Sequence, residues 1–589
     1  MNFSFISRAS RLAAIGAILF GSASCITINE ELGENLIPTD QKWDVFPQDP
    51  VVLEDIRLEM ADSLSGYSTT RFTFGAVNDG SVLGTSSKTS SITLVPIWDT
   101  LDFGTETKIR QFHFTAVRDT LSTVYDNEQR ILQNVYVHEL KKPLDSTIIY
   151  TSSFSDPKVL NEFVDLGRKI SAGTPVYSGG DSLSFDFSME YAEKVWKQID
   201  AAQKAGKMDS VSNYLKYVPG IYFRTDAPAG KGGRINMFRL GIDNSEGYLA
   251  GNYAELKFTA KYDYSDEPVD TSFIFLLGPG DFVNVNKESG EITYPNQFAF
   301  NASDHETSEK YKNGVKATDK IYVEGGGGLK PVVKADDIKR ILEDQIRAAG
   351  IQDESQVVIN KATIVLPYDV NGDYALLDKY PQILSPTVRL HSTDGNYVTY
   401  AGLTDSSIST ENQGDINRSL SVYSPDISHH VQEILKLDRE DPDYSKNIEK
   451  YDIWFLIMAQ ELVEDTTYDS SYDDYYNNLY YNSYYNNMMY DPYGYGYGGY
   501  GGYGGYGYGG YGYGGYGYGG YGYGGYGYSN YYNYAMMAYY SSMSSSATSE
   551  EYVTELDKDR FYSATLNGPS ASGAKPVFKV VFSAPKSAE

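Results

Sequence analysis

The chain contains a single cysteine, Cys25, and the residues before it predict covalent chemistry at its thiol. Arg8 and Arg11 precede an apolar run at 12–20, and small residues then lead directly to the cysteine. This order is typical of a bacterial lipoprotein signal, in which the cysteine is acylated and becomes the new amino terminus. We therefore expect 1–24 to be a signal peptide and Cys25 to carry fatty acyl chains. The alternative is a buried cysteine beside an ordinary cleavage site.

Two short blocks resemble the catalytic blocks of GDSL hydrolases: Gly-Asp-Ser-Leu at 180–183 and Asp-Ile-Ser-His at 426–429. In that family Ser182 would attack the substrate, His429 would be its base and Asp426 would orient the imidazole. That family places its serine after an apolar strand of an α/β fold, whereas the residues before Ser182 here are typical of a turn. We therefore expect that the protein is not an enzyme.

Other groupings of polar residues are weak candidates for metal or phosphate sites. None of the six histidines has a partner at the spacing that places two imidazoles on one helix face. Asp-His-Glu at 304–306 lies in a polar stretch, where we expect solvated side chains. The Gly-rich segment 324–330 lacks the ending of a phosphate loop and predicts a bend, and Asp369 to Asp373 favours a hairpin turn at Asn371 and Gly372 over a calcium loop. We expect no metal and no cofactor.

Composition excludes several classes of partner and topology. The chain has 589 residues, with 78 Asp and Glu against 49 Lys and Arg, so its formal net charge is −29. Such a charge would repel a phosphate backbone, so we expect no nucleic-acid partner. No apolar stretch reaches the roughly 18–20 residues that a membrane-spanning helix needs.

The remaining sequence is rich in short alternating segments that predict strands. Good examples are 91–95, 109–117, 183–187 and 577–582. We expect helices at about 158–170, 189–204, 335–349 and 425–436, the last opened by Ser424 and Pro425. The fold class predicted is mainly β: two jelly-roll-like β-sandwich halves with a few peripheral helices and a disordered Tyr/Gly-rich insertion.

A weak internal repeat supports two halves of similar plan. In each half two strands precede a short strand that runs into a helix, and two more strands follow. Chance similarity among amphipathic strands is the alternative. The predicted organisation is a signal peptide at 1–24, a tether at 25–44, a first β-sandwich domain at 45–285, and a second at 286–589 that is interrupted by a Tyr/Gly-rich loop at 468–540.

The Tyr/Gly-rich loop differs in composition from the rest of the chain. Residues 468–540 hold 29 of the 55 tyrosines and 21 of the 56 glycines, and 492–549 contain no charged residue. The five-residue repeat Gly-Gly-Tyr-Gly-Tyr matches neither a helix nor a strand, so we expect a disordered loop. Its closely spaced tyrosines suit weak multivalent contacts, although the loop could also be filler. The candidate contact residues are Tyr511, Tyr513, Tyr516, Tyr518, Tyr521 and Tyr523.

Several short segments resemble a family of Bacteroidota outer-membrane lipoproteins catalogued as a domain of unknown function (four-two-seventy). They are Cys25 followed by 32–37 (Leu-Gly-Glu-Asn-Leu-Ile), then 74–79 with 83–84, 218–222 and 359–362. The resemblance implies an outer-membrane lipoprotein and supplies no catalytic residues. The Tyr/Gly-rich loop is not part of the family pattern.

Asp-Ser or Asp-Thr followed by an apolar residue or Thr resembles the O-glycosylation signal of the same phylum. The acceptor hydroxyls that this implies belong to Ser63, Thr100, Thr120, Ser146, Ser182, Ser210 and Thr466. Surface export in that phylum resembles a short acidic signal directly after the cysteine, whereas Glu30 and Glu31 come later here. We expect a lipid-anchored protein of the outer membrane that is exposed on the cell surface, with the leaflet left open.

The function expected is that of a non-enzymatic interaction or scaffold subunit of an envelope complex, in outer-membrane protein assembly, secretion or uptake. Its expected partners are the outer membrane, through the lipid anchor, and a membrane β-barrel or an envelope protein complex. The alternative is a surface glycan-binding lipoprotein that serves nutrient capture.

Overall fold

The computed structural model describes residues 43–586, except for 62–63, 120–130, 145–153, 155–156, 244–249, 392–397, 409–412 and 464–550. The predicted signal peptide, most of the predicted tether and the Tyr/Gly-rich loop lie outside these residues. The described chain is mainly β with few helices, and all pairings between its named strands are antiparallel, which confirms the predicted fold class. Within the described part, no helix is long and apolar enough to span a membrane.

The first sandwich has two sheets that share one apolar core. Eight described strands form one sheet: β4 (Tyr67–Ser68), β5 (Arg71–Asn78), β6 (Thr85–Ile92), β10 (Tyr136–Leu140), β11 (Val164–Lys169), β14 (Ile221–Arg224), β15 (Gly232–Arg239) and β22 (Ala299–His305). The facing sheet has the order β13 (Ser182–Asp186), β8 (Thr105–Val117), β18 (Tyr253–Lys261), β19 (Val269–Leu277) and β7 (Leu94–Pro96). Phe72, Phe74 and Phe223 of the first sheet and Phe114 of the second are fully buried in this core. The ring of Phe223 stacks on Phe74, with centroids 5.4 Å apart, and also contacts Phe114 at 5.5 Å.

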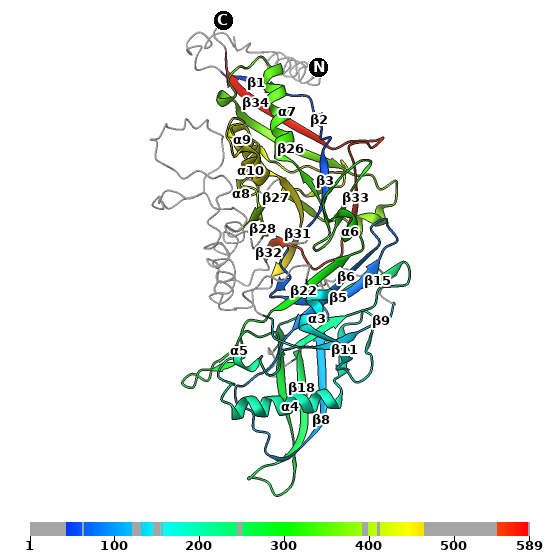
Figure 1. The fold of residues 1–589 in the computed structure, drawn as a ribbon, viewed down its shortest axis with the longest axis vertical. Coiled ribbons are helices and arrows are strands. Elements are labelled where there is room, and N and C mark those ends of the chain that lie inside the picture. The colour runs from blue at the N-terminus through cyan, green and yellow to red at the C-terminus, as the bar shows by residue number, and fades with distance from the viewer. Residues whose placement is uncertain are drawn as a thin grey trace, which may run out of the picture.

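The second sandwich is built in the same way. One sheet contains β1 (Trp43–Pro47), β2 (Val51–Val52), β26 (Val358–Pro367), β29 (Ile416–Asn417), β30 (Val422–Tyr423) and β34 (Val577–Pro585). The other contains β3 (Ile56–Met60), β23 (Val315–Lys316), β25 (Leu329–Val333), β27 (Ile383–His391), β28 (Val398–Gly402), β31 (Ile453–Val463) and β32 (Glu551–Leu556). Ile364 and Phe578 from the first sheet and Phe455 from the second lie in one core cluster. The two sandwiches lie one beyond the other along the long axis of the molecule (Figure 1).

Four short two-stranded pieces complete the described strands. They are β9 (Gln133–Asn134) with β12 (Val176–Tyr177), β16 (Ile242–Asp243) with β17 (Ala250–Gly251), β20 (Asn284–Val285) with β21 (Ile292–Thr293), and β24 (Lys320–Glu324) with β33 (Ser563–Asn567).

The described helices are α3 (Pro157–Phe163), α4 (Met189–Lys204), α5 (Val211–Tyr214), α6 (Ser308–Tyr311), α7 (Ala335–Ala348), α8 (Asp405–Ile408), α9 (Ser428–Lys436) and α10 (Tyr444–Ile448). Several of them pack against the sandwiches, and α4, α7 and α9 contribute buried residues to their cores. The predictions at 189–204 and 335–349 are confirmed. The prediction at 158–170 is wrong beyond Phe163, because β11 begins at Val164 and pairs with β10. The last predicted helix begins at Ser428 rather than at 425, because Asp426 bridges to Thr363 of β26.

The pairing of strands crosses the boundary predicted between residues 285 and 286 in both directions. β1, β2 and β3 come early in the chain but pair with β34 and β25 of the second sandwich. β22 comes after the predicted boundary but pairs with β6 of the first sandwich, from Phe300 opposite Ser91 to His305 opposite Ser86. The chain therefore builds part of the second sandwich before it builds the first.

The five strands that correspond in the predicted internal repeat pair in the same way in both sandwiches, although the sheets differ in their other strands. In the first, β8 lies between β13 and β18, and β10 pairs with β14. In the second, β26 lies between β30 and β34, and β27 pairs with β31. The helix that follows the short strand contacts the corresponding long strand in each case, α4 on β8 and α9 on β26.

Candidate functional site

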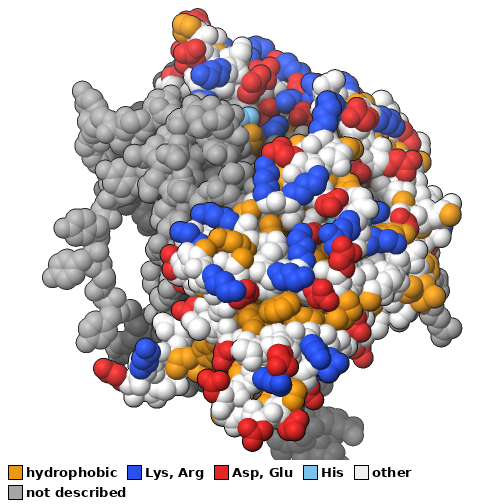
Figure 2. Space-filling view, turned by 60° about the horizontal axis from the view of Figure 1, so that its bottom comes forward, with side chains coloured by type: hydrophobic (Ala, Val, Ile, Leu, Met, Phe, Trp, Pro, Cys, Tyr) orange, Lys and Arg blue, Asp and Glu red, His pale blue; other side chains and the backbone are white. Residues whose placement is uncertain are grey.

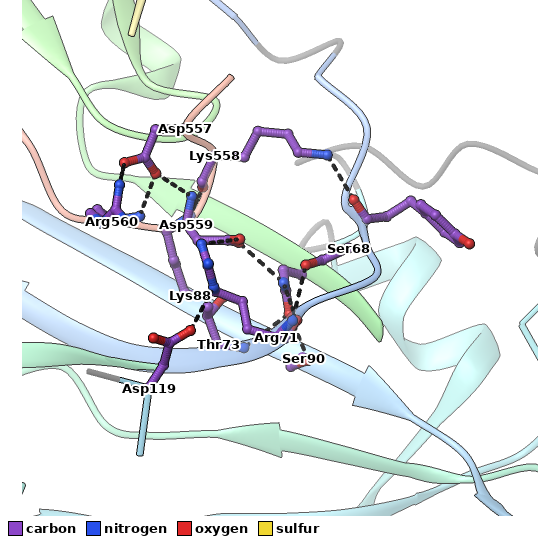
Figure 3. A network of polar contacts seen from close by, with 12 residues as sticks. Ser68, Arg71, Thr73, Lys88, Ser90, Asp119, Asp557, Lys558, Asp559 and Arg560 are labelled. Atoms are coloured by element: carbon purple, nitrogen blue, oxygen red, sulfur yellow. Dashed lines mark hydrogen bonds and ion pairs between the residues drawn. The ribbon is translucent and has the colours of Figure 1, made fainter. Parts of the chain in front are cut away.

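A buried network of polar side chains lies where the two sandwiches meet, and we call it the polar seam. It consists of Arg71, Lys88, Asn301, Ser303, His305, Glu324, Lys330, Asp557, Asp559 and Arg560. These residues come from β5, β6 and β22 of the first sandwich, from the end of β24 and the start of β25, and from the segment after β32. Figure 3 shows the part around Lys88 and Asp559.

Strand β6 has the sequence Thr-Ser-Ser-Lys-Thr-Ser-Ser-Ile, yet it is central in its sheet and mostly buried. Its Lys88 donates from Nζ to Ser303 Oγ at 2.9 Å and to the carbonyl oxygen of Lys558. Burial lowers the pKa of Lys88, and the carboxylates of Asp559 and Asp557 oppose that effect. A buried ammonium requires such partners because leaving it unpaired is strongly unfavourable.

Lys330 occupies a similar position on the other side of the seam. Its Nζ donates to the carbonyl oxygens of Glu324 at 2.5 Å, Gly326 at 3.0 Å and Gly328 at 3.1 Å. Burial lowers the pKa of Lys330 to about 7, against the attraction of the Glu324 carboxylate. The Gly-rich segment is therefore a turn closed around an ammonium group. Gly326 has φ +56°, and a Cβ there would lie 2.6 Å from Ser303 Oγ, so a side chain at this position would be strained and crowded.

His305 is buried, which corrects the expectation of a solvated side chain at this position, whereas Asp304 and Glu306 are exposed as expected. Asp304 and His305 belong to β22, and Glu306 lies just beyond it with a carboxylate that accepts from the backbone N–H of Thr85 at 2.8 Å. His305 Nδ1 lies 3.1 Å from Ser86 Oγ and 3.5 Å from Glu324 Oε1. Burial would raise the pKa of Glu324, but the neighbouring imidazole and the hydrogen bonds from Thr307 and Leu329 outweigh it and lower that pKa.

Asp557 fixes the segment that follows β32. Its carboxylate accepts from Arg560 Nη1 at 2.7 Å, from the Tyr562 hydroxyl at 2.6 Å and from the backbone N–H groups of Asp559 and Arg560. Burial would raise the pKa of Asp557, but the Arg560 guanidinium and these hydrogen bonds outweigh it and lower that pKa. The charged partners therefore keep this buried carboxylate ionised.

The segment also reaches into the first sandwich. Asp559 Oδ1 accepts from Asn301 Nδ2 at 3.1 Å, and Asp559 Oδ2 lies 3.8 Å from Arg71 Nη1. Arg71 Nε in turn donates to Asp119 Oδ2 at 2.9 Å. Figure 3 shows Arg71 between these two carboxylates. Charge-assisted contacts thus join β5 and β22 to a segment more than 250 residues away along the chain.

The polar seam is not among the sites that the sequence predicts. A run of seven polar residues in β6 is typical of a surface strand, and Lys88 and Lys558 are 470 positions apart. One local signal was present, since Lys330 follows the glycines at a distance that lets its side chain reach their carbonyl groups.

The structure does not bring the GDSL-like residues together. Ser182 is exposed and begins β13, a strand at the edge of its sheet in the first sandwich. Asp426 lies just before α9 and His429 lies in its first turn, in the second sandwich, so the two blocks belong to different sandwiches. Asp426 accepts from Ser428, and the backbone N–H of His429 donates to Asp405 Oδ1 at 2.6 Å.

The remaining predicted positions are only partly described. Cys25, the six candidate tyrosines between Tyr511 and Tyr523, and four acceptor hydroxyls lie outside the described residues; these hydroxyls are those of Ser63, Thr120, Ser146 and Thr466. Thr100 and Ser182 are exposed, whereas Ser210 is half-buried and its Oγ caps α5 by accepting from the backbone N–H of Asn213.

The predicted turn at Asn371 and Gly372 is present, with φ of +50° and +82°. It leads into a short 3₁₀ helix (Tyr374–Lys379) rather than into the second strand of a hairpin. Among the described residues no group of three or more His, Cys, Asp or Glu side chains is placed to hold a metal ion.

A shallow groove of about 410 Å³ runs beside α4. Its lining carries both signs of charge, with Arg168 paired to Glu190 at 2.7 Å and Lys194 paired to Glu139 at 2.6 Å. Tyr217 supplies an aromatic ring to the same lining. Several of the charged groups at its rim therefore form ion pairs with neighbouring side chains.

Comparisons with protein-family models, with curated proteins and with solved structures found no match to this chain.

Proposed function

We propose that this protein is a non-enzymatic, lipid-anchored interaction or scaffold subunit of an envelope complex in the bacterial outer membrane, of the Bacteroidota lipoprotein type that its short motifs resemble. The signal-like residues before Cys25 support the anchor. The acidic net charge of −29 supports a partner other than nucleic acid. Assembly of outer-membrane proteins, secretion and uptake are the processes in which such a subunit would act.

The observation that carries the proposal is the place at which the Tyr/Gly-rich segment is connected to the fold. Strands β31 and β32 pair up to Val463 opposite Glu551, so the chain leaves and re-enters the fold at one place. Directly after β32 comes Asp557, which begins the segment buried in the polar seam. A tyrosine-rich segment is thus attached to a well-supported strand pair, which suits the display of an adhesive segment to a partner.

Affinity purification from detergent-solubilised envelope tests the proposal. We expect the full chain to recover a stoichiometric membrane partner, and the same chain without 468–540 to recover less of it. Cys25→Ala should move the protein from the membrane to the soluble fraction. Recovery of a lone monomer, or membrane association that is independent of Cys25, would count against the proposal.

A second candidate function is glycan binding, and one surface feature favours it. Tyr262 and Tyr264 lie after β18, and their rings stack with centroids 5.2 Å apart and planes 12° apart. Tyr262 is held by its hydroxyl, which donates to the carbonyl of Asp102 at 3.0 Å, while Tyr264 is 77% exposed. A sugar ring can stack on such a face, and the exposed carboxylates of Asp263 and Asp266 can accept hydrogen bonds from its hydroxyl groups.

This tyrosine pair lies at the end of the molecule farthest from β1 (Figure 1), and Figure 2 shows apolar side chains among charged ones on that end. A glycan array comparing the full chain with Tyr264→Ala tests the idea, and Tyr374→Ala, which removes a tyrosine that is 73% exposed elsewhere, is the control. Binding that only Tyr264→Ala abolishes would support it, and the absence of binding by the unmodified chain would remove it.

A further inference from the structure

The sheet that contains β1, β34 and β26 carries apolar side chains on both of its faces. The inner face belongs to the core, where Phe46 stacks on Phe582 with centroids 5.7 Å apart. The strand register places Val45 opposite Ser583 and Ser583 opposite Val358 on the other face. We call this the outer face and define it by Trp43, Val45, Val358, Lys361, Lys579 and Val581.

The apolar members of the outer face are exposed. Trp43 is 49% exposed, Val45 61% and Val358 45%, and Val581 is half-buried. An antiparallel sheet with one solvated face normally carries polar residues on that face, and an edge strand such as β1 normally carries charges that prevent association. The outer face carries Lys361 and Lys579, but it also carries a cluster of exposed apolar side chains beside an edge strand, and such a cluster is typical of a surface that another body covers.

The position of the outer face in the chain indicates which body covers it. β1 begins at Trp43, and 17 residues separate it from Cys25. A flexible chain of that length has a root-mean-square span of about 20–25 Å. If Cys25 is anchored as proposed above, the outer face is therefore held at a high effective concentration beside the lipid, so even a weak contact would be occupied.

The side chains of the outer face also suit a lipid surface. Trp favours the boundary between lipid headgroups and acyl chains, and Lys is attracted to anionic headgroups. The side chain of Lys361 is 57% exposed and Lys579 is exposed, and an acidic group near them, Asp426, lies 3.6 Å from the Lys361 ammonium. We propose that the outer face of β1, β34 and β26 rests on the lipid surface that holds the acyl chains, an inference that depends on the proposed lipid anchor.

Quenching of tryptophan fluorescence by brominated lipid tests this contact. The full acylated chain is reconstituted on vesicles of phosphatidylcholine and phosphatidylglycerol whose acyl chains carry bromine, and flotation of the vesicles reports anchoring. We expect the emission to be quenched in the unmodified chain, the quenching to be lost in Trp43→Phe, and the quenching to be retained in Trp98→Phe. Trp98 is 42% exposed on the first sandwich and is the matched control.

A second pair of variants keeps Trp43 in place. Replacing Val45 and Val358 by Glu should abolish the quenching, whereas Val82→Glu, at a position that is 74% exposed on the first sandwich, should preserve it. Protein that floats without quenching overturns the lipid contact and leaves the anchor standing, while protein that does not float overturns the anchor itself. Quenching that persists in Trp43→Phe, or crosslinking of two copies through the outer face without quenching, also overturns the lipid contact.

Discussion

His430 on α9 is a fully buried imidazole whose Nε2 lies 2.8 Å from the carbonyl oxygen of Tyr451. Burial lowers its pKa from 6.5 to about 4, and the Tyr451 carbonyl opposes that shift. The N-terminus of the same helix is capped by Asp405, whose carboxylate accepts from the backbone N–H groups of His429 and His430. The stability of the second sandwich therefore depends on pH through this buried side chain.

The stability of the protein should therefore fall in mild acid. Between pH 6.5 and 4 the unfolded chain binds a proton at His430 and the folded chain does not. The contribution of His430 to the free energy of unfolding is therefore fully present above pH 6.5 and is lost as the pH falls toward 4. The expected loss at pH 4 is about 3 kcal/mol from this one group. Urea unfolding at pH 7 and pH 4.5 measures it. His430→Gln should show a smaller difference between the two pH values, and an equal difference would contradict the assignment.

Asp557 in the polar seam should matter for stability far more than a surface carboxylate. Asp557→Ala leaves the buried Arg560 guanidinium without its main partner, so we expect a loss of about 3–5 kcal/mol. Asp344 lies 3.0 Å from Arg347, but its side chain is 60% exposed. Asp344→Ala should therefore change stability by less than about 1 kcal/mol. Equal shifts of the urea midpoint in the two variants would refute the structural role of the polar seam.

Among the helices and strands, those whose own sequence carries a clear hydrophobic repeat could be predicted. Helices α4 and α7 follow from their amphipathic repeats, and each element holds a stripe of buried residues such as Val195 and Ile199 on α4. Strand β11 was missed because its pairing with β10, and not its own six residues, decides its conformation. The buried position of β6 and the polar seam were missed because their partners lie hundreds of residues away, where sequence spacing carries no information.

Removing the Tyr/Gly-rich loop should leave the fold intact. Strands β31 and β32 stay paired without it, and shortening their connection from the 87 residues of 464–550 to the 14 that remain would stabilise the fold by about 1–2 kcal/mol through loop-closure entropy. Thermal and urea unfolding of the chain without 468–540 measure this effect. A clear drop in stability would mean that the loop packs on the described sandwiches.

At the scale of the whole molecule, the two sandwiches share strands across the sequence and meet at the polar seam. The chain enters the second sandwich at β1, crosses to the first at β4 and returns after β22. The end with β1 and the end with the β18–β19 hairpin lie at opposite poles of the long axis (Figure 1). An anchor before β1 would therefore leave the hairpin pole as the part farthest from the membrane.

Fragments of the chain should reveal this crossing. A fragment of residues 64–307 contains β4 to β22 and should fold, because every strand of the first sandwich keeps its partners. A fragment of residues 45–285 lacks β22, so β6 loses a partner strand and the fragment should aggregate. Circular dichroism and size-exclusion chromatography distinguish the two outcomes. If the fragment of residues 45–285 folds, the β6–β22 pairing is dispensable for folding.

The pairing of Val463 with Glu551 has a consequence for how this gene can change over generations. Because both ends of the intervening stretch are fixed at one point, replication errors that add or remove Gly-Gly-Tyr-Gly-Tyr units alter its reach without moving any residue of the sandwiches. The number of these repeats can therefore change from one generation to the next without altering the fold of the sandwiches. Strains should differ in it while their framework sequences remain aligned.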